Sequence, residues 1–332
     1  MAAFTLTADL TAPQNHWAEL VAHPELLFGH NAPDLVAGTD YLARSPFGSG
    51  GSGRIEAVQH GRVEFTWGGA DWPQPGRFVV YAADDLIVDA RAVPDFEVEP
   101  TRAHWERMLH IAADFLNTPD RAVDSPVEAV LFDADGVLQW PRPGWLEEMT
   151  TLGGPTFVLD AFAAERDCLA GGAELAPLLT GLLTASGTGA TVEQVLQVWH
   201  DIVVDPDALA LVDRLRDSGL IVCLATNQQS LRGAHMRDSL ALDAHFDRAF
   251  YSFEVGHAKP SQEYFRHIVD VLGLPAERVV FVDDAPANVL AARLVGLRGV
   301  LHRVSDGAAG LAADLAGVGV RDPALGSADA SD

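Results

Sequence analysis

Residues 127–138 read VEAVLFDADGVL, and this stretch decides the fold of the larger part of the chain. It begins as an almost continuous apolar run and ends in two carboxylates, Asp133 and Asp135, followed by the turn residue Gly136. Comparable apolar runs recur further along, at 219–226, 278–284 and, more weakly, 298–303. Helical patterns separate these runs. Apolar strands that alternate with helices are typical of a parallel sheet covered on both faces, so the sequence predicts an α/β fold.

The remaining parts of the chain differ from this α/β region. Short alternating runs followed by an amphipathic helix at 101–116 predict an α+β domain. A longer insert after the first α/β strand has a mostly helical pattern. The predicted boundaries are 1–118 for the α+β domain, 119–126 for a polar linker, 127–305 for the α/β domain with its insert at about 144–200, and 306–332 for a flexible tail.

The chain is strongly acidic, with a formal net charge of −25. Phosphate backbones and anionic membranes are bound by basic surfaces, so we expect neither nucleic acid nor membrane as a partner. The first 20 residues contain no basic segment and no long apolar one, and no run of about 18 apolar residues occurs. The two cysteines, Cys168 and Cys223, suggest no disulfide framework. These features predict a cytoplasmic protein.

Polar residues stand at the ends of the predicted strands. Thr226 and Asn227 end the second strand, and Asp283 and Asp284 end a later one. The one lysine of the chain, Lys259, lies just before a predicted helix. Ligands bind outside the carboxyl ends of strands in open α/β sheets. We therefore expect these residues to converge with the two carboxylates of the first strand.

A site with four carboxylates needs a cation, because packed carboxylates repel one another and raise each other's pKa. Mg²⁺ is suited to such oxygen ligands and commonly binds a substrate phosphate as well. Thr226 can donate a hydrogen bond to a phosphoryl oxygen, and Lys259 can neutralise the charge that develops there. The sequence thus predicts a magnesium-dependent phosphoryl-transfer site.

With these motifs in order, residues 127–303 resemble the haloacid dehalogenase (HAD) superfamily. The DxDGVL element at 133–138, the Thr226-Asn227 strand end, Lys259-Pro260 and the Asp283-Asp284 pair match its four motifs. The helical insert resembles the cap of subfamily I members. The resemblance implies a Rossmann-like parallel sheet as the HAD core, a helical cap, and Mg²⁺ as the cofactor.

The resemblance also implies a role for each motif residue. Asp133 would attack phosphorus and form an aspartyl-phosphate, while Asp135 would protonate the leaving oxygen and then activate water. True dehalogenases lack the second carboxylate, so its presence favours a phosphatase. The implied metal ligands are Asp133, Asp135 through its backbone carbonyl, Asp284, and Asp283 as a direct or indirect ligand. The implied phosphate-binding residues are Thr226, Asn227 and Lys259.

The N-terminal segment resembles the START-like (SRPBCC, Aha1-type) helix-grip fold. The features that carry this resemblance are Ala12-Pro13 with Trp17, Gly53-Arg54-Ile55-Glu56, Phe65-Thr66-Trp67, and His104-Trp105 at the start of the last helix. The segment is short for that family. Its tryptophans are open to two interpretations, a ligand pocket or core packing: Trp17, Trp67, Trp72 and Trp105.

Three functions are compatible with these patterns. The first is a phosphatase acting on a small phosphorylated metabolite. The second is a sugar-phosphate mutase with the same nucleophile. The third is a binding protein for an apolar ligand in the N-terminal domain, with the HAD part as a scaffold. Trp140, Arg142 and Trp145 follow the nucleophile loop and either face the substrate or stabilise the cap.

Overall fold

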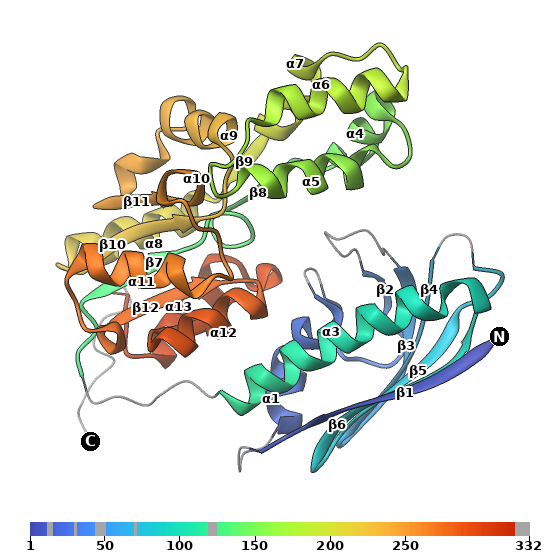
Figure 1. Ribbon diagram of the computed structural model, residues 1–332. Coiled ribbons are helices and arrows are strands. Elements are labelled where there is room, and N and C mark those ends of the chain that lie inside the picture. The colour runs from blue at the N-terminus through green and yellow to red at the C-terminus, as the bar shows by residue number, and fades with distance from the viewer. Residues whose placement is uncertain (12–15, 30–31, 44–50, 70–71, 119–124, 323–332) are drawn as a thin grey trace, which may run out of the picture. The chain divides into compact units, whose positions relative to one another are not determined.

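A computed structural model describes residues 1–11, 16–29, 32–43, 51–69, 72–118 and 125–322. The chain divides into two compact units, and each is treated by itself below (Figure 1). The first comprises residues 1–119 together with 285–290, and the second comprises 120–284 and 291–332. Within the described ranges, no helix is long and apolar enough to cross a membrane.

The first unit contains a six-stranded antiparallel sheet and a long C-terminal helix (Figure 1). The strand order is β1-β6-β5-β4-β3-β2. The strands are β1 (Ala2–Asp9), β2 (Asp40–Ala43), β3 (Gly51–Gln59), β4 (Arg62–Gly68), β5 (Gly76–Ala82) and β6 (Asp85–Val93). The helices are α1 (His16–Ala22), α2 (Glu25–Phe28) and α3 (Val98–Asn117). This agrees with the α+β arrangement expected from the sequence.

Alternation of side chains explains why this sheet has one buried face. In β4, Val63, Phe65 and Trp67 are buried, and the residues between them are more exposed. Trp105 of α3 packs against Phe65 and Phe78, with ring centroids 5.4 and 5.5 Å apart respectively. An aromatic core therefore joins the helix to the sheet. The START-like resemblance of this unit stays a prediction, and Ala12-Pro13 lies outside the described residues.

The second unit is built on a five-stranded parallel sheet in the order β11-β10-β7-β12-β13. The strands are β7 (Ala129–Phe132), β10 (Ile221–Thr226), β11 (Arg248–Tyr251), β12 (Val279–Asp283) and β13 (Arg298–Leu301). β7, which the opening stretch of sequence contributes, lies in the centre, and all four of its residues are buried. The predicted α/β fold is thus confirmed, with β11 as an edge strand that the sequence reading did not identify.

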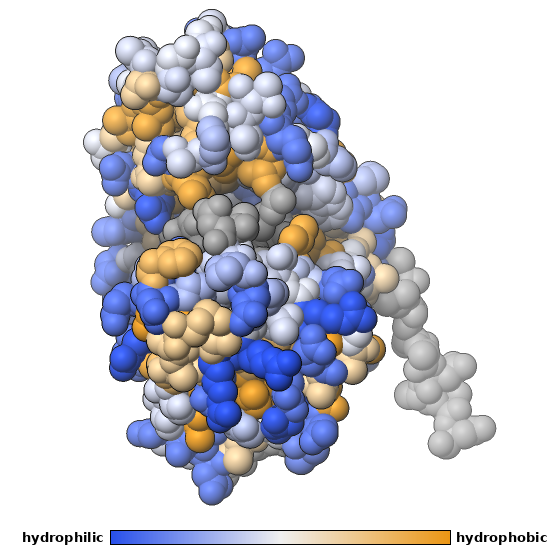
Figure 2. Space-filling view, turned by 90° about the vertical axis from the view of Figure 1, so that its right-hand side faces the viewer, coloured by the Kyte–Doolittle hydropathy of each residue, from blue (hydrophilic) through white to orange (hydrophobic). Residues whose placement is uncertain are grey.

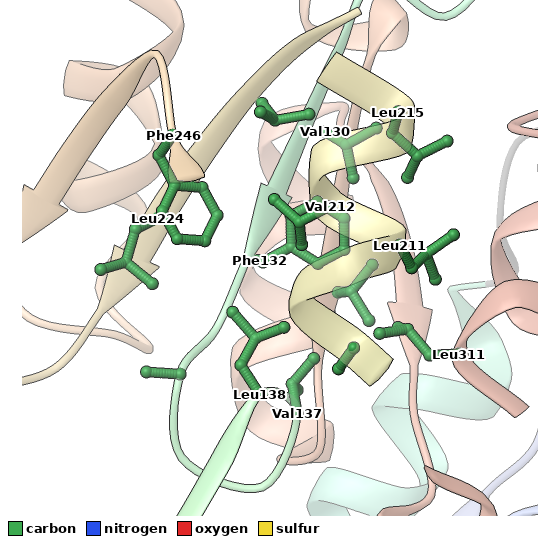
Figure 3. Close-up of a cluster of buried hydrophobic side chains, with 14 of the residues drawn as sticks. Val130, Phe132, Val137, Leu138, Leu211, Val212, Leu215, Leu224, Phe246 and Leu311 are labelled. Carbon is green, nitrogen blue, oxygen red and sulfur yellow. The ribbon is translucent and has the colours of Figure 1, made fainter. Parts of the chain in front are cut away.

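Helices cover both faces of this sheet. They are α8 (Pro206–Asp217), α9 (Ser230–Ala234), α10 (Ser252–Val255), α11 (Gln262–Leu272), α13 (Gly307–Gly317) and, from residue 291 on, α12 (Pro286–Val295). On one face, Val130 and Phe132 pack with Leu211 of α8 and Leu311 of α13 (Figure 3). The alternate residues of β7 and the inner side of α11 form the core of the other face.

The insert forms a helical cap. Its helices are α4 (Trp145–Gly153), α5 (Phe157–Cys168), α6 (Leu175–Ser186) and α7 (Val192–His200). The antiparallel pair β8 (Gln139–Pro141) and β9 (Ile202–Val204) connects the cap to the parallel sheet. Met149, Phe157 and Leu175 belong to a buried cluster within the cap. These four helices all lie within the insert predicted at about 144–200.

The predicted flexible tail is wrong for its first part. Residues 307–317 form α13, and Leu311 and Leu315, one helical turn apart, are buried in the core. Beyond the helix, Asp322 accepts two hydrogen bonds from Arg214 of α8, at 2.9 and 2.7 Å. Small residues gave this segment a flexible appearance, but its two leucines bind it to the sheet. Most of the predicted linker, and the tail from 323, lie outside the described residues.

The surface carries both hydrophilic and hydrophobic residues. On the face shown in Figure 2, hydrophilic residues predominate and hydrophobic ones form separate groups.

Candidate active site

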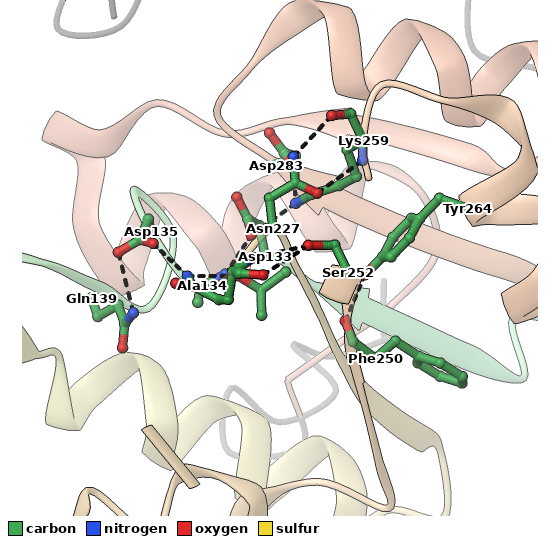
Figure 4. A network of polar contacts seen from close by, with 12 residues as sticks. Asp133, Ala134, Asp135, Gln139, Asn227, Phe250, Ser252, Lys259, Tyr264 and Asp283 are labelled. Carbon is green, nitrogen blue, oxygen red and sulfur yellow. Dashed lines mark hydrogen bonds and ion pairs between the residues drawn. The ribbon is translucent and has the colours of Figure 1, made fainter. Parts of the chain in front are cut away.

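The predicted site residues meet at one edge of the parallel sheet (Figure 4). Asp133 directly follows β7, Thr226 is the last residue of β10, and Asp283 is the last residue of β12. Because these three strands are neighbours and parallel, their carboxyl ends lie side by side. Lys259 reaches the same edge from the loop between α10 and α11. All four residues are buried.

Three carboxylates form the centre of the site. One oxygen each of Asp133, Asp283 and Asp284 lies within 4.8 Å of the others, and all three residues are buried. Three hard oxygen donors at this separation fit Mg²⁺, which prefers such ligands and keeps positions for water and phosphate. Gly136 leaves room for this group, because a Cβ atom at that position would lie 2.5 Å from the Asp284 carboxylate.

Lys259 balances part of this negative charge. Its ammonium lies 2.8 Å from Asp133 Oδ1 and 2.6 Å from Asp283 Oδ2. Burial raises the pKa of Asp133 well above its usual range, and Lys259 opposes this while the two other carboxylates add to it. Burial alone would lower the pKa of Lys259, but Asp133 and Asp283 outweigh it and the net shift is upward. Lys259 therefore stays protonated in the site, and the remaining negative charge of the three carboxylates favours binding of a metal cation.

The Asn227 side chain positions Lys259. Its Nδ2 donates to the Lys259 carbonyl at 2.8 Å, and its Oδ1 accepts from the Lys259 backbone N–H at 2.8 Å. With the amide used in this way, the geometry does not support the predicted contact of this side chain with phosphate. Thr226, by contrast, has its hydroxyl beside the site, where it accepts a 3.2 Å hydrogen bond from Gln228 Nε2.

The Asp135 carboxylate is separate from the group of three. Arg232 holds it with both terminal nitrogens, Nη2 donating to Oδ1 at 2.7 Å. Gln228 Nε2 donates to Oδ2 at 2.8 Å, and Gln139 Nε2 donates to Oδ1 at 3.1 Å. Burial would raise the pKa of Asp135, but Arg232 outweighs it, so the pKa is lowered. Two carboxylates two residues apart therefore occupy opposite electrostatic surroundings, and the Asp135 side chain is not one of the clustered metal donors.

Sequence reasoning missed four residues around Asp135. They are Gln139, Gln228, Arg232 and the half-buried Glu165 of the cap. Burial raises the pKa of Glu165 to about 7, with Arg232 opposing and Asp135 adding to the shift. Gln228 follows Thr226-Asn227 directly, so its position beside a motif was the one available signal. The other three residues stand at no sequence spacing that indicates a site, and Arg232 is one of many arginines in the chain.

Two of the residues after the Asp133–Leu138 loop contact side chains of the cap and its connection to the sheet. Arg142 forms ion pairs with Glu148 and Asp201. Trp145 packs edge to face on Phe162 at a centroid distance of 5.8 Å. For these residues the interpretation as cap-stabilising side chains agrees with the structure.

Comparison with known proteins agrees with this geometry. The Escherichia coli GMP/IMP nucleotidase YrfG is 31% identical over 96 residues, which are 29% of this chain and 43% of that protein. A Thermotoga maritima phosphorylated carbohydrates phosphatase is 25% identical over 200 residues, 55% of this chain and 89% of that protein. This chain spans less than half the length of the first curated relatives that it matches.

A solved structure of a HAD family enzyme from Bacteroides thetaiotaomicron, in complex with magnesium, is 20% identical with a TM-score of 0.49. That alignment covers 54% of this chain and 95% of the other. The family model of haloacid dehalogenase-like hydrolases matches residues 127–296, just over half of the 332 residues. The match contains β7 with Asp133, the cap and the acidic pair Asp283-Asp284 together. The chain therefore belongs to the haloacid dehalogenase-like hydrolases, a family of enzymes, and Mg²⁺ is the cofactor that fits its site.

Proposed function

We propose that this protein is a magnesium-dependent phosphatase that hydrolyses a small phosphoester through an aspartyl-phosphate on Asp133. The observation that carries the proposal is the division of the carboxylates. Asp133 lies with two others and Lys259, while Asp135 is held apart by Arg232. A phosphoester needs both a nucleophile and a separate group that moves a proton, because its alkoxide leaving group is strongly basic.

Each residue has a defined task in this reaction. Asp133 presents an oxygen to phosphorus, and its Oδ1 is fixed by Lys259 Nζ at 2.8 Å and by the Ala134 backbone N–H at 2.7 Å. The bond from phosphorus to the leaving oxygen breaks as the Asp133–phosphorus bond forms. Asp135 acts in this step in its protonated form, the minor one because Arg232 lowers its pKa, and gives the leaving oxygen that proton. Asp135 then takes a proton from the water that attacks phosphorus and frees Asp133. Thr226 and Lys259 bind the transferring phosphoryl oxygens.

Magnesium would be held by Asp133, Asp283 or Asp284, and the backbone carbonyl of Asp135. When bound, it supplies positive charge beside the phosphoryl oxygens. The three carboxylates of this chain present oxygen donors to it, and Lys259 limits the excess of negative charge that remains.

The relatives support a phosphatase without fixing its substrate. Their names specify a nucleotidase, a carbohydrate phosphatase and a sesquiterpene phosphatase of Aspergillus oryzae, which belong to three different classes of phosphorylated compound. We therefore propose a small phosphorylated metabolite and no narrower class. A sugar-phosphate mutase with the same nucleophile is the second candidate, because Asp133 would serve both reactions.

Binding of an apolar ligand by the first unit has weaker support. Thr101 Oγ1 and Trp105 Nε1 are buried one helical turn apart in α3 and have no hydrogen-bond partner within the described ranges. A ligand with a polar group would satisfy them. However, Trp105 is packed directly against Phe65 and Phe78, which indicates a filled core at this point.

The test is phosphate release by the purified chain with Mg²⁺ across a panel of phosphorylated metabolites. We expect turnover of at least one compound, and we expect Asp133→Asn to lower kcat/KM by more than about 1,000-fold, since the nucleophile is lost. Isomerised product without free phosphate would instead select the mutase. Absence of any turnover above the Asp133→Asn background would contradict both enzyme functions.

A further inference from the structure

Arg232 joins three parts of the enzyme through one guanidinium group. It lies in α9, where Gln229 Oε1 caps the helix by accepting the backbone N–H groups of Leu231 and Arg232 at 2.8 and 3.2 Å. Its side chain is 8% exposed. An arginine is buried at low cost only when its N–H groups are used, so the partners of this one indicate what it does.

Those partners are the Asp135 carboxylate, a glutamine and the cap. Both terminal nitrogens contact Asp135, and Nη1 also donates to Gln228 Oε1 at 2.9 Å. Nε donates to the Trp199 carbonyl at 3.2 Å. Trp199 is the next-to-last residue of α7, the last helix of the cap. The same group therefore contacts the proton-transferring residue and the point where the cap returns to the sheet.

Two carboxylates, one from the loop after β7 and one from the cap, interact with the Arg232 guanidinium. Asp135 comes from the loop after β7, and Glu165 comes from α5 of the cap and interacts with Arg232 electrostatically. The planar fork of an arginine fixes the plane of a carboxylate through two parallel hydrogen bonds, which an ammonium cannot do. Asp135 is thus held in one orientation by a residue that also contacts the cap.

We propose that Arg232 is a positioning residue that aligns Asp135 for proton transfer to the leaving group and ties this alignment to the cap. This inference rests on the proposed phosphatase function, in which Asp135 transfers the proton. Arg232 acts through Asp135 and needs no contact with the substrate. The consequence is a dependence on the leaving group. A leaving oxygen of low basicity departs without a proton and is insensitive to Asp135, whereas a basic one depends on its alignment.

The experiment compares Arg232→Lys with a matched control, Arg237→Lys. Arg237 lies five residues along the same segment and forms the same kind of forked ion pair, with Glu254 at 2.8 and 2.9 Å, and its ion-pair partners are Glu254 and Asp243 instead of Asp135. Lysine at 232 keeps the positive charge and removes the fork, so the comparison isolates alignment. The probes are 4-nitrophenyl phosphate and phenyl phosphate, which have similar size and differ in leaving-group basicity.

We expect Arg232→Lys to lower kcat/KM for phenyl phosphate at least about tenfold more than for 4-nitrophenyl phosphate, since aligned acid catalysis contributes about 10²–10⁴-fold. Arg237→Lys should lower both equally or not at all. Equal losses for the two probes in Arg232→Lys would overturn the inference and leave the phosphatase function intact. Absence of Asp133-dependent turnover in the wild-type protein would overturn both.

A second measurement does not depend on turnover. Loss of the hydrogen bond from Arg232 Nε should release the end of α7, so amide hydrogen exchange at residues 198–202 should accelerate about tenfold, the equivalent of one charge-assisted hydrogen bond. The Arg237→Lys protein should exchange like the wild type there. Unchanged exchange in Arg232→Lys would overturn the connection to the cap. Thermal unfolding of both variants shows whether they are folded under the assay conditions.

Discussion

The two units of the chain bury different kinds of side chain. In the first unit the interior is aromatic, with Phe65, Phe78 and Trp105 packed on one another. In the second unit the sheet edge buries charged residues, among them Asp133 and Lys259. Burial of an aromatic side chain stabilises a fold, whereas burial of a charge costs free energy unless it is paired. The aromatic cluster is explained by folding alone, whereas the cluster of buried charges at the sheet edge needs a function to explain it.

This contrast predicts that a cavity in the first unit affects stability and leaves catalysis intact. Trp105 is 2% exposed, so Trp105→Ala should lower the free energy of unfolding of that unit by about 3–5 kcal/mol. Because the proposed catalytic residues all belong to the second unit, kcat for phosphate release should not change below the unfolding temperature. Calorimetric unfolding and a phosphatase assay measure the two quantities.

Phe96→Ala is the matched control, because Phe96 is an aromatic residue of the same region that is 64% exposed. It should change the free energy of unfolding by less than about 0.5 kcal/mol. A fall in kcat in Trp105→Ala that is absent from Phe96→Ala would break the comparison, since it would give the first unit a part in catalysis.

The contrast also explains what could be predicted from the sequence. The parallel sheet and the site edge were predictable because apolar runs end in Asp133, Thr226 and Asp283, and parallel strands bring such ends together. The short edge strand β11 was not, since it has four residues and begins with the charged Arg248. Arg232 was not predictable either, because its role depends on a tertiary contact with a residue 97 positions away.

For the first unit, the sequence predicted the order of the strands and helices but no reaction. Its strands alternate regularly, so the antiparallel sheet and the final helix could be anticipated. No polar residue in it stands at a spacing that indicates a reaction. Small residues misled the interpretation of the chain end, where Leu311 and Leu315 secure a helix that the composition concealed. Sequence patterns thus predicted secondary-structure elements in both units and candidate site residues in one.

A methyl group added at the site edge should change the function of the site, whereas a cavity in the first unit should change stability. In Gly136→Ala the new Cβ would lie 2.5 Å from the Asp284 carboxylate, so that carboxylate or the loop must shift. We expect the affinity for Mg²⁺ to fall about 10–100-fold, as it does when groups that orient a metal ligand are disturbed. Titration calorimetry with Mg²⁺ measures the change directly.

Gly144→Ala is the control for backbone strain. Gly136 and Gly144 have φ values of 86° and 88°, but the nearest atom to a Cβ at Gly144 is 4.0 Å away. Both substitutions should therefore strain the backbone to a similar extent and destabilise the fold similarly. Equal Mg²⁺ affinities in the two variants would show that the contact with Asp284 has no effect.

The smallest predicted effect is a pH dependence of opposite sign in the two units. Glu165 has a pKa of about 7 in the folded protein, so the stability of the second unit should fall as pH rises from about 4.5 to 7. His104, which stacks on Trp67, has its pKa lowered by burial to about 4. The folded state binds fewer protons there than the unfolded state, so the stability of the first unit should fall as pH decreases from about 6.5 to 4.

Each contribution should be about 1 kcal/mol, because both side chains are partly exposed. Unfolding followed between pH 4 and 8 measures it, with Glu165→Gln and His104→Gln as the variants in which the respective dependence flattens. If Glu165→Gln flattened the response of the first unit, or His104→Gln that of the second, the two units would share one titration. Protonation of a group in one unit would then change the stability of the other. The aromatic interior and the charged interior would no longer belong to two independent parts of the molecule.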